Sequence, residues 1–181
     1  MTDEQILKSR ITDLAKTAYQ QNIYTYSNFL TPEELSLIDD TLEDISYVHH
    51  TCFGGNELSE RQIVGFGSEE EFGYPGTFPI AVIRITPLLA KFSDDLNHRD
   101  FLGALMNLGI DRSTTGDILV YEKEAILLCK KSMADYICEN LLRVRHTSVD
   151  AAVCDSADMT AVAPQKELLE GSVSSDRLDC I

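Results

Sequence analysis

The sequence has no tryptophan, no Cys-X-X-Cys pair and no apolar run of the length that crosses a bilayer. A membrane helix needs about 20 apolar residues, and zinc knuckles and disulfide frameworks need closely spaced or evenly paired cysteines. The five cysteines are odd in number and widely scattered. The first ten residues also lack the basic start and apolar core of a signal peptide. These absences predict a cytoplasmic protein with reduced thiols and no membrane partner.

Positive charge is scarce as well, because 15 Lys and Arg stand against 30 Asp and Glu, for a net charge of −15 at pH 7. Binding to nucleic acid needs clustered cations. Residues 1–80 carry 4 Lys and Arg against 14 Asp and Glu, residues 81–155 carry 9 against 11, and residues 156–181 carry 2 against 5. The acid is therefore concentrated in the first half, whereas the second half could hold a local basic patch.

Residues 1–75 predict an N-terminal α+β domain of helices and one β-hairpin. Apolar residues at helical spacing mark two helices, of which the second has Thr31 as N-cap and Pro32 at its first position. Alternating residues then mark two strands around a Gly54-Gly55 turn. The predicted elements are helices over 4–21 and 32–45, an aromatic link over 24–29, and strands over 47–53 and 61–66. The acidic, Gly- and Pro-rich segment 69–79 marks the end of this domain.

The stretch from Leu96 to Val120 contains a helix start, a helix stop and a strand in quick succession. Asn97 is a good N-cap, and Asp100 supplies the reciprocal carboxylate of a capping box. The helix should therefore begin at His98. Gly109 can take the left-handed conformation that ends a helix, with Ile110 behind it as the hydrophobic contact of a Schellman motif.

Residues 76–156 predict a second domain with the element order βαββαβ. This order is that of a ferredoxin-like plait, so the fold class is α+β. Ser132 and Asp135 form a capping box that predicts the start of the second helix of this domain. The predicted elements are strands over 80–86, 116–121, 125–129 and 149–153 and helices over 98–108 and 132–144. Residues 157–181 predict a linker, because apolar periodicity fades there.

Chain direction in such a plait sorts the basic residues of this domain to two ends. One end gathers His98, Arg99, Lys123, Arg143, Arg145 and His146. The other gathers Arg112, Lys130 and Lys131 beside the helix start at Ser132, where free backbone N–H groups favour an anion. Each cluster could hold phosphates, or could be surface charge that balances nearby acids, which is the commoner arrangement. The candidate RNA- or phosphate-binding residues are Arg84, His98, Arg99, Arg112, Lys130, Lys131, Arg143 and Arg145.

The sequence gives little support for base stacking, metal binding or catalysis. The central strands of the plait offer Ala125 to Cys129 with no aromatic ring, so base stacking on this sheet is not expected. His49 and His50 would point to opposite faces of a strand and could not easily share a metal ion. No nucleophile motif, Gly-rich phosphate loop or pair of carboxylates stands out. We therefore expect no catalytic residue, no cofactor and no metal site, and a protein that is not an enzyme.

Three places in the chain resemble the YlmH-type bacterial RNA-binding proteins, a family that ends in a module like ribosomal protein S-four. The strongest resemblance is HRDFLGALMNLGI at 98–110, with Arg112 and GDILV at 116–120. Weaker matches are FLTPEE at 29–34 and Gly54-Gly55 with Glu60-Arg61. Residues 171–179 resemble the entry into the terminal module, which is expected to lie beyond Ile181.

The resemblance implies a non-enzymatic, ribosome-associated protein that binds ribosomal RNA or tRNA. It further implies a role in translation quality control on large subunits that carry peptidyl-tRNA, with a link to cell division. The acidic charge predicts that this chain alone binds RNA weakly and that the terminal module supplies most of the affinity. The alternative is a protein-interaction adaptor whose acidic first half docks on a basic partner such as a ribosomal protein.

Overall fold

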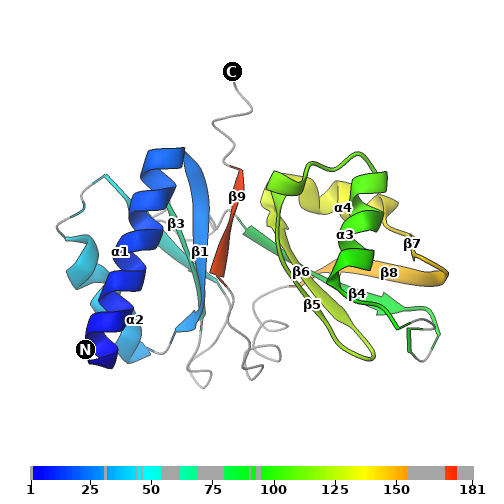
Figure 1. Cartoon of the computed structure of the whole chain (residues 1–181), viewed down its shortest axis with the longest axis horizontal. Helices are drawn as coiled ribbons and strands as arrows, with labels where there is room; N and C mark the ends of the chain where they lie inside the picture. Colours follow the sequence, from blue (N-terminus) through cyan, green and yellow to red (C-terminus); the bar gives the residue numbers. More distant parts are fainter. Residues whose placement is uncertain are drawn as a thin grey trace. The chain divides into compact units, whose positions relative to one another are not determined.

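The computed structural model (Figure 1) describes residues 2–30, 32–43, 45, 47–53, 62–68, 80–89, 91–92, 95–154 and 170–174. The chain divides into two compact units, unit 1 (residues 1–79 and 156–181) and unit 2 (residues 80–155). Unit 2 is thus inserted between two segments of unit 1. Each unit combines helices with an antiparallel sheet.

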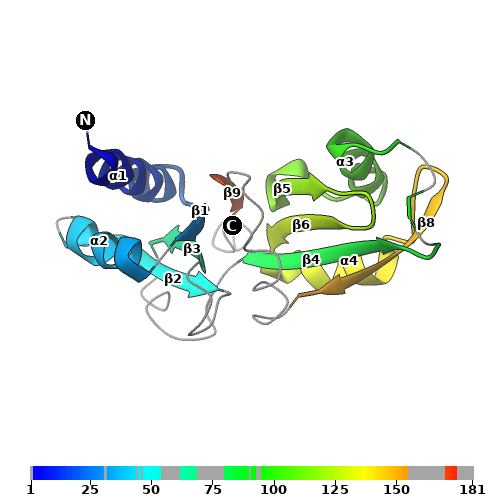
Figure 2. The same cartoon turned by 90° about the horizontal axis from the view of Figure 1, so that it is seen from below.

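Unit 1 packs two helices against a four-stranded sheet of order β2-β3-β1-β9. Its core joins buried residues of both helices to Val64 and Phe66 of the sheet, and Figure 2 shows the two helices along one side of the strands. Thr2 and Gln5 form a capping box at the start of the first helix, and Asn22 ends it in a left-handed conformation, with φ 53°. The elements are α1 (Asp3–Gln21), β1 (Ile23–Leu30), α2 (Pro32–Leu42), β2 (His49–Phe53), β3 (Gln62–Gly67) and β9 (Glu170–Ser174).

Two predictions for unit 1 are wrong. The predicted aromatic link over 24–29 is strand β1, which lies between β3 and β9. Tyr24, Thr25 and Tyr26 are all buried. Buried and exposed side chains therefore do not alternate over these three residues, and the usual sequence pattern of a strand is missing. The predicted linker over 157–181 contains β9, whose Val173 is 1% exposed and pairs with Tyr24. Edge pairing with β1 thus places a distant segment in the sheet of unit 1.

Unit 2 packs two helices on one face of a five-stranded antiparallel sheet of order β5-β6-β4-β8-β7. Its core joins Phe101 and Leu105 of one helix and Ile137 of the other to the inward residues of the strands. Every residue of β6 is buried. The elements are β4 (Ile80–Pro87), α3 (His98–Asn107), η2 (Arg112–Thr114), β5 (Thr115–Val120), β6 (Ala125–Lys130), η3 (Lys131–Met133), α4 (Ala134–Asn140), β7 (Arg143–Val144) and β8 (Thr147–Val153).

The predicted helix over 132–144 is wrong at both ends. Residues 131–133 form a 3-10 turn, and α4 begins at Ala134 with no side-chain capping bond, so Ser132 is not its N-cap. The helix ends at Asn140 because the next segment forms a hairpin, in which Val144 is buried and pairs with Thr147. Tertiary pairing overrides the helical periodicity here. The last strand likewise begins at Thr147, two residues earlier than predicted.

Some predictions fall outside the described residues. They are the Thr31 cap, the Gly54-Gly55 turn and the boundary segment 69–79. The paired strands on either side of the turn are described, and β2 and β3 form the predicted antiparallel hairpin.

Candidate nucleic-acid interface

Helix α3 is fixed at both ends by the signals that its sequence carries. The Asn97 side chain accepts hydrogen bonds from the backbone N–H of Arg99 (2.9 Å) and Asp100 (3.3 Å), and Asp100 Oδ2 accepts from the Asn97 N–H (2.9 Å). At the other end Gly109 has φ 82°. The N–H groups of Gly109 and Ile110 bond to the carbonyls of Met106 (3.0 Å) and Leu105 (3.3 Å), which is the predicted Schellman motif.

A short hairpin after α4 faces the same region of unit 2. Leu141 leaves the helix in an extended conformation, and β7 pairs Arg143 with Ser148 and Val144 with Thr147 of β8. The two-residue turn between them needs left-handed backbone, which Arg145 supplies with φ 53°. An arginine in this conformation is uncommon, and the turn holds its side chain at the surface, 57% exposed.

A groove of about 530 Å³ runs between α3 and the segment from Asn140 to Arg145. We call it the arginine groove, since three predicted residues, Arg99, Arg143 and Arg145, line it. All three are exposed. The described residues that line it are Arg99, Asp100, Gly103, Ala104, Asn107, Leu108, Asn140, Leu141, Leu142, Arg143 and Arg145. None of these described residues is aromatic, so the groove suits contacts to phosphate and sugar better than stacking on bases.

The electrostatics of the groove are set by three guanidinium groups and one carboxylate. Arg145 Nη1 lies 3.5 Å from Asp100 Oδ1, whose side chain is 18% exposed. The amides of Asn107 and Asn140 add neutral hydrogen-bonding groups, and the Asn140 amide donates to the Tyr136 carbonyl at 2.8 Å. The lining thus carries a positive balance in a chain that is strongly acidic as a whole.

The structure brings together only part of the first predicted cluster. His98, Lys123 and His146 are exposed but do not line the groove. Arg84 lies apart from it on β4 and forms an ion pair with Glu124 (Nε to Oε2, 3.0 Å). A phosphate that binds Arg84 would therefore have to compete with the Glu124 carboxylate.

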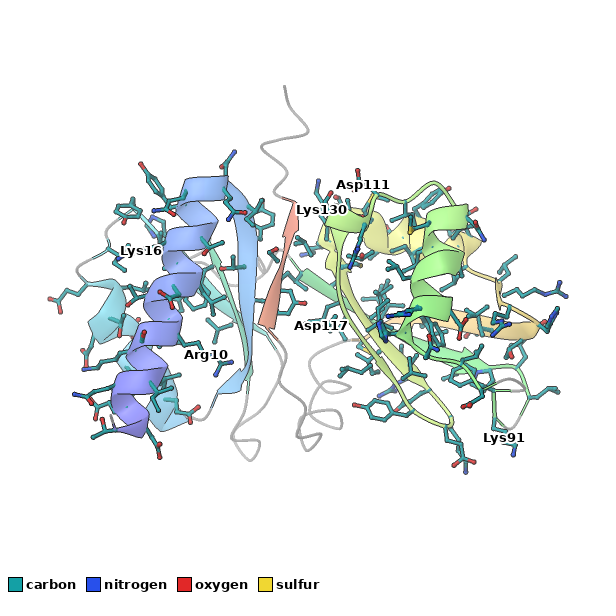
Figure 3. All side chains as sticks on the ribbon, viewed as in Figure 1. Arg10, Lys16, Lys91, Asp111, Asp117 and Lys130 are labelled. Atoms are coloured by element: carbon teal, nitrogen blue, oxygen red, sulfur yellow. The ribbon has the colours of Figure 1, made fainter. Side chains whose placement is uncertain are left out.

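The second predicted cluster does not form an anion site of the kind expected. Lys130 is 2% exposed, whereas Arg112 and Lys131 are exposed. Figure 3 shows Lys130 and Asp111 near the same end of unit 2, with Lys91 at the opposite end. The argument from a helix start at Ser132 fails because α4 begins later and spans only 7 residues. Nearby, hydrogen bonds from Ser113 to Asp111 lower the pKa of that carboxyl.

Several groove residues were missed by sequence reasoning. Gly103 and Asn107 follow Arg99 at intervals of four along α3, so they share its face, and this helical spacing could have identified them. Asp100 was recognised only as a capping residue. Asn140 and Leu142 could not have been placed, because the predicted helix continued through them.

His50 and the described cysteines Cys129, Cys138 and Cys154 are at least partly buried. Within the described residues, no group of three or more His, Cys, Asp or Glu could hold a metal ion. His50 Nε2 lies 3.6 Å from Asp39 Oδ1, and burial lowers the pKa of this imidazole. Cys129, Cys138 and Cys154 form no disulfide, and burial raises the pKa of Cys129 to about 12. No described helix has the length and apolar character that membrane crossing requires.

Comparison with known proteins defines the class to which this fold and groove belong. Residues 76–158, which contain the whole arginine groove, match the family model described as "Putative RNA-binding domain in YlmH". The chain is 33% identical over 182 residues to the ribosome-associated protein quality control protein P2 of Bacillus subtilis (strain 168), an alignment that covers 99% of this chain and 68% of the relative. The chain therefore belongs to the YlmH family, as its sequence motifs predicted.

A solved structure is similar as well. It is that of the cell division protein ylmH from Streptococcus pneumoniae, with 17% sequence identity and a TM-score of 0.41 over 85% of this chain and 92% of that one.

Proposed function

We propose that this chain is a non-enzymatic RNA-binding protein that associates with cytoplasmic ribosomes and serves ribosome-associated quality control. The name of the Bacillus subtilis relative, a ribosome-associated quality control protein, and the match to a family of RNA-binding domains support this proposal. The RNA would be ribosomal RNA or tRNA, on large subunits that carry peptidyl-tRNA. One observation carries the proposal for this chain: three arginines within the matched segment converge on a single groove.

In this proposal the arginine groove holds the ribose-phosphate backbone. Guanidinium groups bind phosphate oxygens in a fixed, often bidentate geometry. Base stacking has little support, because neither the groove lining nor the described central strands of unit 2 offer an aromatic ring. The net charge of −15 opposes any polyanion, so we expect weak binding that falls steeply with salt.

The strand order also supports the finer fold assignment that we propose for unit 2. In sequence, β4, β5, β6 and β8 are the four strands of a βαββαβ unit, and they lie in the order β5-β6-β4-β8 with both helices packed on one face. This order and the shared helix face are those of a ferredoxin-like plait, to which β7 adds a short edge strand.

The experiment is a salt titration of RNA binding with charge-matched variants. A fluorescent RNA hairpin of about 16 base pairs is titrated with the wild-type chain between about 50 and about 300 mM salt. The groove variant carries Arg99→Gln, Arg143→Gln and Arg145→Gln. The control variant carries Lys16→Gln, Lys91→Gln and Lys123→Gln, three exposed residues outside the groove.

Both variants lose the same charge, so a difference between them reports the groove. We expect the groove variant to lose more than about tenfold in RNA affinity at low salt. The slope of log K against log salt should also become shallower by about 2, because each phosphate contact contributes about 0.7–0.9 to it. The control should stay within about threefold of wild type. Equal losses in the two variants would contradict the proposal.

A second candidate function is an adaptor that docks on a basic partner. A separate groove in unit 1, of about 520 Å³, favours it, because Asp39, Asp40 and Glu43 line it beside His49 and His50. If this function is correct, capture of a basic ribosomal protein should survive nuclease digestion and fall when Asp40→Asn and Glu43→Gln are introduced. Capture that disappears with nuclease would instead favour RNA as the bridge.

A further inference from the structure

Asp100 holds an unusual position for an acidic residue. Among the described residues that line the arginine groove, it carries the only carboxylate. Its Oδ2 accepts from the Asn97 N–H at 2.9 Å, which completes the capping box of α3. Its Oδ1 lies 3.5 Å from Arg145 Nη1. One side chain thus connects the start of α3 to the β7–β8 turn.

These contacts give the three arginines unequal positions. Arg145 has an anionic partner within the groove, and no ion pair is found for Arg99 or Arg143 with another described residue. The carboxylate that pairs with Arg145 is only 18% exposed, so solvent screens it less than a surface acid. An entering phosphate must therefore draw Arg145 away from Asp100 and also tolerate a fixed negative charge beside it.

We propose that Asp100 is a specificity-determining residue of the arginine groove, which holds Arg145 in the free protein and makes productive binding depend on a ligand with several linked phosphates. This inference rests on the proposed function. A single phosphate that enters near Arg145 meets the Asp100 carboxylate and gains little. A polynucleotide backbone binds Arg99 and Arg143 at the same time, and these contacts offset the cost of separating Arg145 from Asp100.

The capping box fixes the position of the Asp100 carboxylate. A carboxylate at the first turn of α3 is stabilised by the helix dipole and by the Asn97 N–H. It therefore stays in place when Arg145 leaves. A freely rotating carboxylate could follow the arginine or turn away from the ligand. It would then distinguish a single phosphate from several linked phosphates less well.

The test uses Asp100→Asn in the full chain, with the RNA hairpin and salt series described above. Asparagine keeps an oxygen that can accept from the Asn97 N–H but removes the charge. Asp135→Asn is the matched control, because Asp135 is an exposed acid in the first turn of α4 and does not line the groove. We expect Asp100→Asn to raise RNA affinity about three- to tenfold and to steepen the salt slope by up to about 0.9. Asp135→Asn should change both by much less.

A double-mutant cycle identifies the partner. If Asp100 acts through Arg145, the gain from Asp100→Asn should be smaller in the Arg145→Gln background, where only the direct repulsion between Asp100 and phosphate remains. Arg145→Gln alone should also cost less affinity than Arg143→Gln, because Asp100 already offsets the charge of Arg145. This comparison does not require Asp100→Asn to fold. Inorganic phosphate should compete with the hairpin more strongly in Asp100→Asn than in wild type.

The outcomes separate the two proposals. If Asp100→Asn binds no better than Asp135→Asn, or if Arg145→Gln costs as much as Arg143→Gln, the role of Asp100 is wrong while the groove can still bind RNA. If the triple groove variant binds like its charge-matched control, the proposed function itself is wrong.

Discussion

Two glycines of the α3 region predict opposite responses to the same substitution. Gly103 lies inside α3, and a Cβ added there would meet no atom within 4 Å. Gly109 lies just past the end of the helix with φ 82°, and its added Cβ would also meet nothing within 4 Å. Steric crowding is thus absent at both sites, and only backbone conformation differs.

The magnitudes follow from this difference. Alanine is favoured over glycine in a helix interior by about 0.5–1 kcal/mol, so Gly103→Ala should stabilise unit 2 by about that amount. A left-handed conformation costs an L-residue about 1–2 kcal/mol, so Gly109→Ala should destabilise it by about 1–2 kcal/mol. The two variants should therefore differ by about 2 kcal/mol, close to a 30-fold change in the opening equilibrium.

Native-state hydrogen exchange measures this difference within unit 2 itself. The amide of Leu105 is a suitable probe, because Leu105 is 1% exposed and lies in the core of the unit. Its opening free energy should rise in Gly103→Ala and fall in Gly109→Ala. Changes of the same sign in both variants would refute the Schellman geometry on which the placement of α3 rests.

Three other predictions concern buried groups. Burial lowers the pKa of His50 in the folded state below its usual value of 6.5. The unfolded state therefore binds more protons than the folded state just below pH 6.5. The wild-type chain should lose stability as pH falls from about 7 toward the lowered pKa. In His50→Gln, pH-dependent urea unfolding should show a smaller loss. The Cys129 thiol, with its pKa raised to about 12, should resist alkylation in the native chain and react after unfolding, as peptide mapping would show. Val173→Asp should expose β1 amides to faster exchange, since Val173 is 1% exposed and pairs with Tyr24; unchanged β1 protection would exclude β9 from the sheet.

Sequence reasoning succeeded where a few neighbouring residues determine the structure. Asn97 with Asp100 and Gly109 with Ile110 specify both ends of α3 by local hydrogen bonds, and each was predicted. It failed where partners are distant. The strand β9 contains a single apolar side chain, Val173, and exists through pairing with β1, far away in the sequence.

The site was predicted in part for the same reason. Chain direction in the predicted βαββαβ order grouped Arg99, Arg143 and Arg145 at one end, and all three line the groove, but a groove depends on how helix and hairpin pack. The early end of α4 and the left-handed Arg145 create that packing, and neither has a clear local signal. The same chain direction grouped Lys130 with exposed residues, although the structure buries it.

Binding of RNA in the arginine groove can be mapped on the chain by nuclear magnetic resonance. In this measurement, backbone amide chemical shifts of the isotope-labelled chain are followed at low salt while the RNA hairpin is added. The account predicts that the largest shifts fall on residues 97–108 and 140–147, with little change in α1, α2 or β5. Shifts that concentrate in unit 1, or that leave Arg99, Gly103 and Arg143 unmoved while RNA binds, would contradict it.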